Sequence, residues 1–280
     1  MPLLEPTPTV GTYPPKQHVL RDLGFESEFG DGATARGWIP VSEPVWSASG
    51  SPHPGALATL VDAVGGGLAG MAARPDWIAT ADLTLHVLPV TGVQRVEARG
   101  RVVRKGRTTI VVEVDLATDP NQDLGLATMT FAILPRRDGN PVMEPAASVT
   151  RTTMALPSSG FREPLEAATG LTTIDAASGT VELPFTDYVL NTLGAVQGGM
   201  MAMTAAVAAE RALTSAAGRA VDIVDLHVTY LALAKVGPVI SRTTALTCTP
   251  TFGTAHVELM DAGADDRVTT VVRARGVWSR

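Results

Sequence analysis

The chain repeats itself with an offset of 144 residues, and this repeat constrains the fold more than any other feature of the sequence. The offset aligns His53 with Gln197, and it drifts only slightly elsewhere, since 82–87 (DLTLHV) resembles 225–230 (DLHVTY) at an offset of 143. A self-match at a fixed period sets the architecture of a protein. We therefore predict a duplicated domain with small insertions and deletions in its loops.

The two copies of the most similar segment have lost complementary parts. In this alignment Asp62 lies opposite Ala206, and Pro54 lies opposite Gly198. The first copy keeps a carboxylate but has a proline, which has no N–H, at a helix start. The second copy keeps the glycine N–H but has an alanine in place of the acid. Each copy alone would be half a site, and together they could make one.

Length and composition agree with two globular domains. A chain of 280 residues suits two domains of about 130 residues each. A hydrophobic content of 45% with 18% charged residues is enough for packed cores. No segment reaches the roughly 18 uninterrupted apolar residues of a membrane span, so we expect no membrane partner. The net charge of −6 argues against nucleic-acid binding.

The N-terminus and the cysteine content indicate a cytoplasmic protein. Residues 1–8 (MPLLEPTP) lack the basic and apolar regions of a signal peptide, and their prolines suggest a loose arm. The single cysteine, Cys248, excludes an intramolecular disulfide and a cysteine-based zinc site. Both features fit a reducing compartment.

Each copy reads as one long helix followed by strands, which is an α+β layout. The helices are expected at 56–73 and 198–217, where Ala, Leu and Met favour helix. Alternating runs predict antiparallel strands at 81–89, 95–104, 108–117 and 126–134, and again at 221–233, 238–249, 254–260 and 268–278. The predicted organisation is a flexible arm (1–17), a first unit (18–134), a linker (135–162) and a second unit (163–280).

These motifs resemble the hotdog-fold acyl-CoA thioesterases, most closely the phenylacetate-pathway and 4-hydroxybenzoyl-CoA branch. The resemblance rests on a helix start with an acid nine residues after His53, then Asp-Leu-x-Leu-x-Val-x-Pro and an Arg-x-Gly-Arg hairpin. It covers both copies, so it implies a double hotdog. In that family a six-stranded antiparallel sheet wraps a central helix, two units pair into one continuous sheet, and the active sites lie between the units.

The family motif is Asn-x5-His-Gly-Gly-x6-Asp, and neither copy has all of it. The second copy has Asn191 and Gly198-Gly199, but Gln197 replaces the histidine and Ala206 replaces the acid. At the corresponding positions the first copy has Ser47, His53, Pro54, Gly55 and Asp62. In the family the polarising glycine and the acid come from different units. The resemblance therefore implies one working site that joins Gly198, Asn191 and Gln197 with Asp62, and one dead site.

The chemistry of thioester hydrolysis explains this pairing. Negative charge develops on the carbonyl oxygen, and a backbone N–H at a helix N-terminus, here that of Gly198, is a preorganised donor for it. Losing one such donor typically costs about 10² to 10³ in rate. A carboxylate on an apolar helix can act as a general base or attack the carbonyl itself. Asp62 is the candidate acid, and the choice between base and nucleophile stays open.

Several candidates also have a structural explanation. Asn191 and Gln197 could cap the helix or fill a loop. Asp62 could be a buried acid paired with a structural donor, and His53 is interpreted as a relic that forms a local hydrogen bond. Glu210, one turn beyond Ala206, could replace the missing acid, but a solvated helix face is the favoured interpretation.

Substrate contacts are predicted at the second glycine of the motif and at a basic hairpin. Gly199 could serve the substrate or only the backbone geometry. Arg104, Lys105 and Arg107 could bind the phosphates of coenzyme A, although a charged hairpin tip is the simpler explanation. His86, His227 and His256 lie on strands without metal-ligand spacing, so no metal is expected.

The leading hypothesis is hydrolysis of an acyl-CoA thioester, without a cofactor except the coenzyme A that belongs to the substrate. The alternative is a protein that binds an acyl-CoA or fatty-acyl group without turning it over. A hotdog hydratase is a weaker option, because an Asp-x4-Asn/His pattern is not apparent. The acyl group cannot be identified from the sequence. The resemblance also suggests a homodimer of double-hotdog chains.

Overall fold

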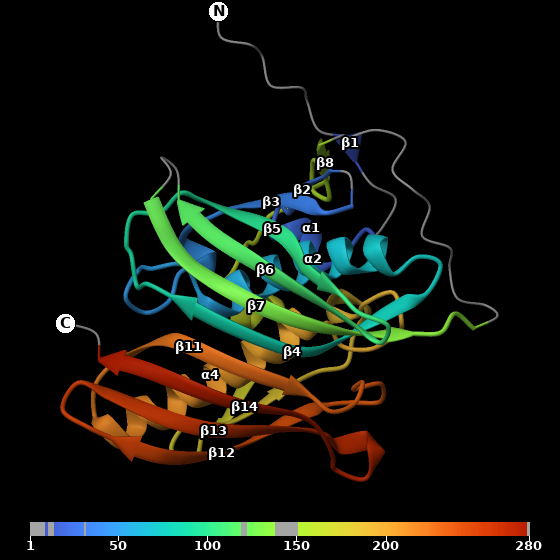
Figure 1. Cartoon of the computed structure of the whole chain (residues 1–280). Helices are drawn as coiled ribbons and strands as arrows, with labels where there is room; N and C mark the ends of the chain where they lie inside the picture. Colours follow the sequence, from blue (N-terminus) through green and yellow to red (C-terminus); the bar gives the residue numbers. More distant parts are fainter. Residues whose placement is uncertain (1–8, 11–13, 31, 119–121, 138–150, 279–280) are drawn as a thin grey trace, which may run out of the picture.

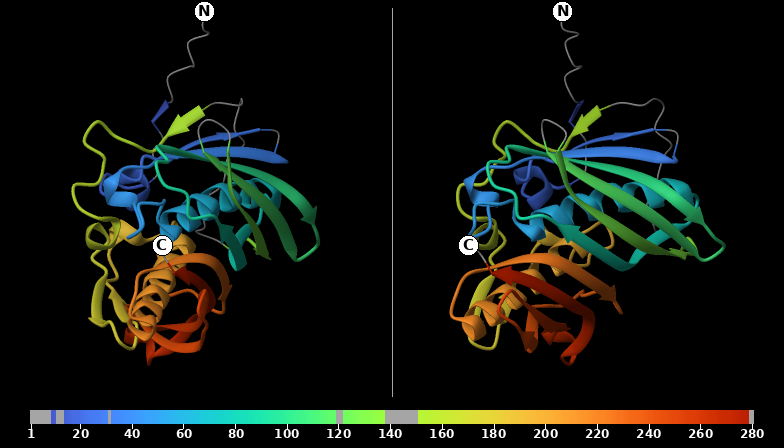
Figure 2. Two further views of the ribbon diagram at one scale, coloured as in Figure 1. Left: turned by 90° about the vertical axis from the view of Figure 1, so that its left-hand side faces the viewer. Right: turned by 60° about the vertical axis from the view of Figure 1, so that its left-hand side comes forward.

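The two halves of the chain join edge to edge in one sheet, and each half of that sheet curls around a long helix (Figures 1 and 2). The computed structural model describes all residues except 1–8, 11–13, 31, 119–121, 138–150 and 279–280. In this part of the chain the sheet contains 14 strands in the order β1-β8-β2-β3-β5-β6-β7-β4-β11-β14-β13-β12-β10-β9.

The first unit has six strands around helix α2. Its strands follow the order β2-β3-β5-β6-β7-β4, all antiparallel. The elements are α1 (Val19–Asp22), β2 (Glu26–Phe29), β3 (Thr34–Pro40), η1 (Glu43–Val45), α2 (Pro54–Ala73), β4 (Trp77–Val87), β5 (Arg95–Lys105), β6 (Thr109–Thr118) and β7 (Gln122–Leu134). Strands β2 and β3 precede the helix and were not located from the sequence.

The second unit repeats this arrangement around helix α4. Its strands follow the order β9-β10-β12-β13-β14-β11. The elements are α3 (Leu165–Ala168), β9 (Thr172–Asp175), β10 (Thr180–Leu183), η2 (Asp187–Val189), α4 (Gly198–Ala217), β11 (Val221–Tyr230), β12 (Val239–Cys248), β13 (Phe252–Asp261), η3 (Ala262–Ala264) and β14 (Arg267–Trp278). The same sequence of elements in both halves gives the double hotdog that was predicted.

The two units meet through antiparallel pairing of β4 with β11, in which Leu85 lies opposite Leu226. Both leucines are buried, since they belong to the inward rows of their strands. The outer row at the same seam carries polar side chains, as expected when one face of an antiparallel sheet is solvated. The seam therefore makes one continuous sheet and brings the two helices together beneath it (Figure 2).

The segment that was predicted as a linker contributes a strand. Residues Arg151–Thr153 form β8, which pairs with β2, and Thr9–Val10 form β1, which pairs with β8. The Arg151 guanidinium binds Glu26 at 2.6 Å and lies over the ring of Trp38. Residues 1–8 and 11–13 of the predicted arm and residues 138–150 of the predicted linker lie outside the described residues.

Helix α2 is apolar because it is the core of its unit. It is long and apolar enough to cross a membrane, but most of its residues are buried against the sheet and α4. Pro54 occupies its first turn, where the missing N–H removes no helical hydrogen bond. Helix α4 ends at Gly218, whose φ of 66° is the left-handed conformation typical of a helix C-terminus.

Helices α2 and α4 approach each other closely near their N-termini. A Cβ atom on Gly199 would lie 2.5 Å from the Cα of Thr59, and a Cβ on Gly55 would lie 2.9 Å from the Cα of Met203. These two contacts are equivalent under the repeat, because 55 aligns with 199 and 59 with 203. Only glycine fits at both points. The crossing places the first turn of each helix against the middle of the other.

Candidate active site

The carboxylate of Asp62 lies against the first turn of α4, so an acid of the first unit meets a helix start of the second. Its Oδ2 accepts a hydrogen bond from the N–H of Gly199 at 3.1 Å. Its Oδ1 accepts one from the hydroxyl of Thr80, on β4, at 3.1 Å. The structure thus brings together two groups that are 137 residues apart in the chain.

Gly198 is the first residue of α4, and its lack of a side chain allows the acid to approach. A Cβ atom at this position would lie 2.9 Å from Oδ1 of Asp62. The N–H of Gly198 has no hydrogen-bond acceptor among the described residues, as is common for the first N–H groups of a helix. This donor lies at the positive end of the helix dipole, which favours negative charge.

Burial raises the pKa of Asp62 to about 6, although the hydrogen bonds from Gly199 and Thr80 oppose this increase. The residue is nevertheless partly accessible to solvent, as are Gly198 and Thr80. A carboxyl group with a pKa near neutrality can take up and release a proton during turnover. The geometry and the pKa of Asp62 together suit a general base or a carboxylate nucleophile.

Tyr230, at the end of β11, adds a second contact that fixes the start of α4. Its hydroxyl donates to the carbonyl oxygen of Gly198 at 2.8 Å. Burial raises the pKa of Tyr230 well above its ordinary value, and the charge of Asp62 adds to this effect. The hydroxyl therefore keeps its proton. Neither Tyr230 nor Thr80 was found from the sequence, because no short motif includes them.

The side chain of Asn191 closes the loop before α4. Its Oδ1 accepts hydrogen bonds from the N–H groups of Leu193 at 2.8 Å and Ala195 at 3.2 Å. This is the loop-forming role that the sequence left open as the alternative to catalysis. Asn191 therefore shapes the approach to α4.

Gln197, the N-cap residue of α4, is buried and faces the first helix of the chain. Its Nε2 lies 3.0 Å from Nε2 of His18, and the carbonyl oxygen of Leu190 lies 3.4 Å away. His18 itself caps α1 and also contacts Leu190. These contacts fasten the start of α4 to the first unit, and a catalytic role for Gln197 stays a prediction.

The predicted coenzyme A contacts lie on the hairpin between β5 and β6. Arg104 and Lys105 end β5, Arg107 is in the turn, and all three are exposed. The structure shows a charged hairpin tip, and a role in phosphate binding stays a prediction. Gly199 has two structural contacts: its N–H donates a hydrogen bond to Asp62, and its Cα packs closely against Thr59.

At the other end of the helix pair the structure corrects one interpretation. Glu210 is not on a solvated helix face: its side chain is only 13% exposed, and it lies with His53 and Glu166. His53 forms the local hydrogen bond that was expected, since its Nδ1 accepts from the N–H of Gly55 at 3.0 Å. Ala206 is buried, as is Pro54.

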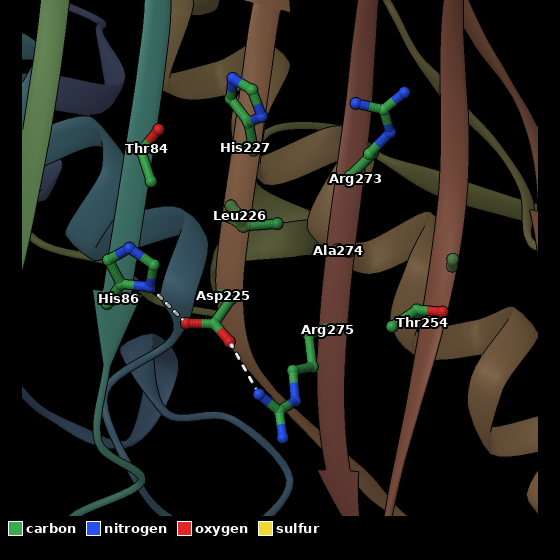
Figure 3. Close-up of a pocket in the computed structure, with 10 residues that line it drawn as sticks. Thr84, His86, Asp225, Leu226, His227, Thr254, Arg273, Ala274 and Arg275 are labelled. Atoms are coloured by element: carbon green, nitrogen blue, oxygen red, sulfur yellow. Dashed lines mark hydrogen bonds and ion pairs between the residues drawn. The ribbon is translucent and has the colours of Figure 1, made fainter. Parts of the chain in front are cut away.

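A separate hollow of about 350 Å³ lies on the outer face of the sheet, over the seam (Figure 3). His86 there binds Asp225 at 2.5 Å, and Arg275 lies 3.9 Å from the same carboxylate. His227 binds Asp82 at 2.9 Å. These histidines pair with acids across the seam, and the hollow does not include Asp62.

The raised pKa of Asp62 predicts that this residue lowers the stability of the folded chain at neutral pH. The folded state binds the proton more tightly than the unfolded state, where the pKa is 3.8, so stability falls as the pH rises through about 6. Asp62→Asn should therefore raise the free energy of unfolding at pH 8 by about 2 to 3 kcal/mol. Urea unfolding should show no such gain at pH 4, and an equal gain at both pH values would contradict this explanation.

Two family models match the chain, one in each half. The model described as the thioesterase superfamily matches residues 50–124. The model described as the acyl-CoA thioesterase N-terminal domain matches residues 189–279. No curated protein sequence matches the chain significantly.

Solved structures with the same arrangement cover nearly the whole chain. A tesB protein of Mycobacterium avium subspecies paratuberculosis is 15% identical with a TM-score of 0.62, over 91% of this chain and 96% of its own. A hot dog fold protein of Alicyclobacillus acidocaldarius is 13% identical with a TM-score of 0.60, over 94% and 98%. An acyl-ACP thioesterase of Bacteroides thetaiotaomicron is 10% identical with a TM-score of 0.56, over 87% and 97%. At these identities the likeness shows a shared fold.

Proposed function

The chain belongs to the thioesterase superfamily and has a double hotdog fold, and from this premise we propose that it hydrolyses acyl-CoA thioesters to a free acid and coenzyme A. The reaction takes place at a composite site between the units, with Asp62 on one side and the N-terminus of α4 on the other. The observation that carries the proposal is the hydrogen bond between Asp62 and Gly199, which joins the acid of one copy to the helix start of the other.

The carbonyl oxygen of the thioester accepts a hydrogen bond from the N–H of Gly198, where the helix dipole stabilises the charge that develops on it. Ionised Asp62 removes a proton from a water molecule as the water oxygen bonds to the carbonyl carbon. The carbon–sulfur bond then breaks, and the proton held by Asp62 passes to the sulfur of coenzyme A. Direct attack by the carboxylate is the alternative first step, and the products are the same.

The surrounding contacts hold this geometry. Thr80 and Gly199 each bind one oxygen of Asp62, which fixes the orientation of the carboxylate. On the opposite side of the peptide group that joins Gly198 to Gly199, the Tyr230 hydroxyl donates to the carbonyl oxygen of Gly198. A catalytic group that is fixed in this way loses little entropy when the substrate binds.

Hydrolysis is tested with a panel of acyl-CoAs of different chain length, including an aromatic one, by following the release of free coenzyme A thiol. We expect turnover of at least one member of the panel. A protein that only binds acyl-CoA would retain the thioester in equilibrium dialysis without releasing thiol, and that result would overturn the proposal. Rapid hydration of an enoyl-CoA without thiol release would instead indicate a hydratase.

The pH dependence of kcat/KM is expected to follow the ionisation of Asp62. The reactive form is the carboxylate, so activity should be low at pH 5 and rise to a plateau above pH 7, with an apparent pKa of about 6. The measurement is kcat/KM for the best substrate of the panel in buffers of constant ionic strength. A profile that is flat between pH 5 and 7 would exclude Asp62 as the base.

A further inference from the structure

A second group of titratable side chains lies at the opposite end of the helix pair, at the N-terminus of α2. His53 caps α2, Glu210 comes from α4 and Glu166 from α3. Nε2 of His53 and one carboxylate oxygen of each glutamate all lie within 4.8 Å of one another. An acid of the second unit therefore meets a helix start of the first, which resembles the Asp62 site with the two units exchanged, although Glu210 lies one turn after Ala206, the residue that aligns with Asp62.

The hydrogen bond at the other ring nitrogen fixes the tautomer of His53. Because Nδ1 accepts from the N–H of Gly55 at 3.0 Å, the proton of the neutral ring must be on Nε2. The ring is only 4% exposed, and Nε2 has no hydrogen-bond acceptor among the described residues. Glu166 lies 3.8 Å away, beyond hydrogen-bond distance. Nε2–H is thus a buried donor that points toward the two acids.

This tautomer excludes the simplest alternative, a metal ion held by the three residues. A metal would need the lone pair of Nε2, so the proton would have to move to Nδ1 and break the cap with Gly55. The position of the proton on Nε2 therefore favours water over a metal ion.

Arg211 holds the two acids in place and sets the charge of the group. Its guanidinium binds Glu166 at 2.7 Å and Glu210 at 2.9 Å. Two carboxylates and one guanidinium leave a net negative charge, and Asp222 on β11 adds to it. Burial raises the pKa of Glu210. A carboxylate in these surroundings readily accepts a proton from a bound water.

We infer that this group is a second hydrolytic centre for acyl-CoA thioesters, in which His53 Nε2–H supplies the donor that Pro54 lacks and Glu210 supplies the acid that Ala206 lacks. The inference rests on the proposed function and adds a second site to it. A water molecule between Glu210 and Glu166 gives a proton to Glu210 as its oxygen bonds to the carbonyl carbon, while the carbonyl oxygen accepts from His53. The carbon–sulfur bond breaks, and the proton of Glu210 passes to the sulfur.

The second centre should be slower than the first. It lacks the backbone donor at the helix start, and the loss of one such donor costs about 10² to 10³ in rate. Its net negative charge also disfavours the charge that develops on the carbonyl oxygen. The centre therefore contributes little to the wild-type rate, and its hydrolytic activity can be measured only in a variant that lacks the Asp62 carboxylate.

The test compares Asp62→Asn with Asp62→Asn/Glu210→Gln and Asp62→Asn/His53→Asn, using the fastest substrate of the panel. Asn at position 53 is a good N-cap and keeps an acceptor for Gly55, but it has no Nε2 donor. We expect each double variant to lose at least about tenfold of the residual kcat of Asp62→Asn. Glu163→Gln, an exposed change just before α3, is the matched control and should leave the residual rate unchanged.

Binding stoichiometry gives an independent readout. A thioether analogue of the fastest substrate, which cannot be hydrolysed, should bind at two sites per chain by calorimetry, and also at two sites in Glu210→Gln, because Glu210 acts in the chemical step rather than in binding. One site in both proteins, or equal residual rates in the single and double variants, would overturn the inference and leave the proposed function intact. No binding together with no turnover in the wild type would instead contradict the proposed function itself.

Discussion

Asp62→Asn is expected to lower kcat for acyl-CoA hydrolysis by about 10² to 10⁴, with a much smaller change in KM. Asparagine has the same shape as aspartate, and its oxygen can still accept from Gly199 while its amide faces Thr80. The substitution therefore removes the proton acceptor and leaves the position of the first turn of α4 unchanged. The loss should appear in kcat because the carboxylate acts in the chemical step rather than in binding.

Steady-state thiol release at pH 8 is the measurement, because Asp62 is then fully ionised in the wild type. Asp115→Asn, an exposed change on β6 with the same loss of charge, is the control and should retain full activity. If Asp62→Asn keeps more than half of the wild-type kcat, the acid is a structural group. The residual rate of this variant also sets the upper limit for the centre around His53 and Glu210.

The repeat showed that each copy lacks one half of the site, and the resemblance to the hotdog thioesterases implied that the acid and the glycine come from different units. Asp62 is in the middle of its helix and Gly198 at the start of its own, and crossing helices bring these positions together. The close crossing requires glycine at the points of contact, and these glycines, Gly55 and Gly199, occupy equivalent positions in the two copies. The sequence did not show that the glycines meet Met203 and Thr59.

Other parts of the site depend on packing that no short motif encodes. Thr80 reaches Asp62 only because β4 lies over α2, and Tyr230 reaches Gly198 only because β11 pairs with β4. The charge of Glu210 suggested a solvated face, yet α3 and the cap of α2 cover that face and Arg211 neutralises part of its charge.

The strands before each helix were missed for a related reason. Strands β2, β9 and β10 have only four residues each, too few to show a clear alternation. Strand β8 lies in a stretch rich in proline and small residues, which is why this stretch was predicted to be a linker. The strand is held in place by the contacts of Arg151 with Glu26 and Trp38. Its pairing partner is more than a hundred residues away in the chain, so local patterns could not predict it.

Gly199→Ala is expected to lower the free energy of unfolding by about 3 kcal/mol, which corresponds to a decrease in Tm of roughly 6 to 12 °C for a protein of this size. The new methyl group would lie 2.5 Å from the Cα of Thr59, which is backbone and cannot be moved by a side-chain rotation. Helices α2 and α4 would have to separate. Activity should fall as well, because the N–H of residue 199 would move away from Asp62.

The matched control for this substitution is Gly66→Ala, in the interior of α2. A Cβ there would meet only the ring of Phe131, at an ordinary distance of 3.9 Å, and alanine favours helix over glycine by about 1 kcal/mol. This variant should therefore be as stable as the wild type or more stable, with unchanged kcat. Thermal unfolding of both variants separates a general effect of adding a methyl group to a core helix from a specific effect at the crossing. If Gly199→Ala unfolds at the wild-type temperature, the close approach of the two helices is not a requirement of the fold, and the position of Asp62 must depend on the seam between β4 and β11 instead.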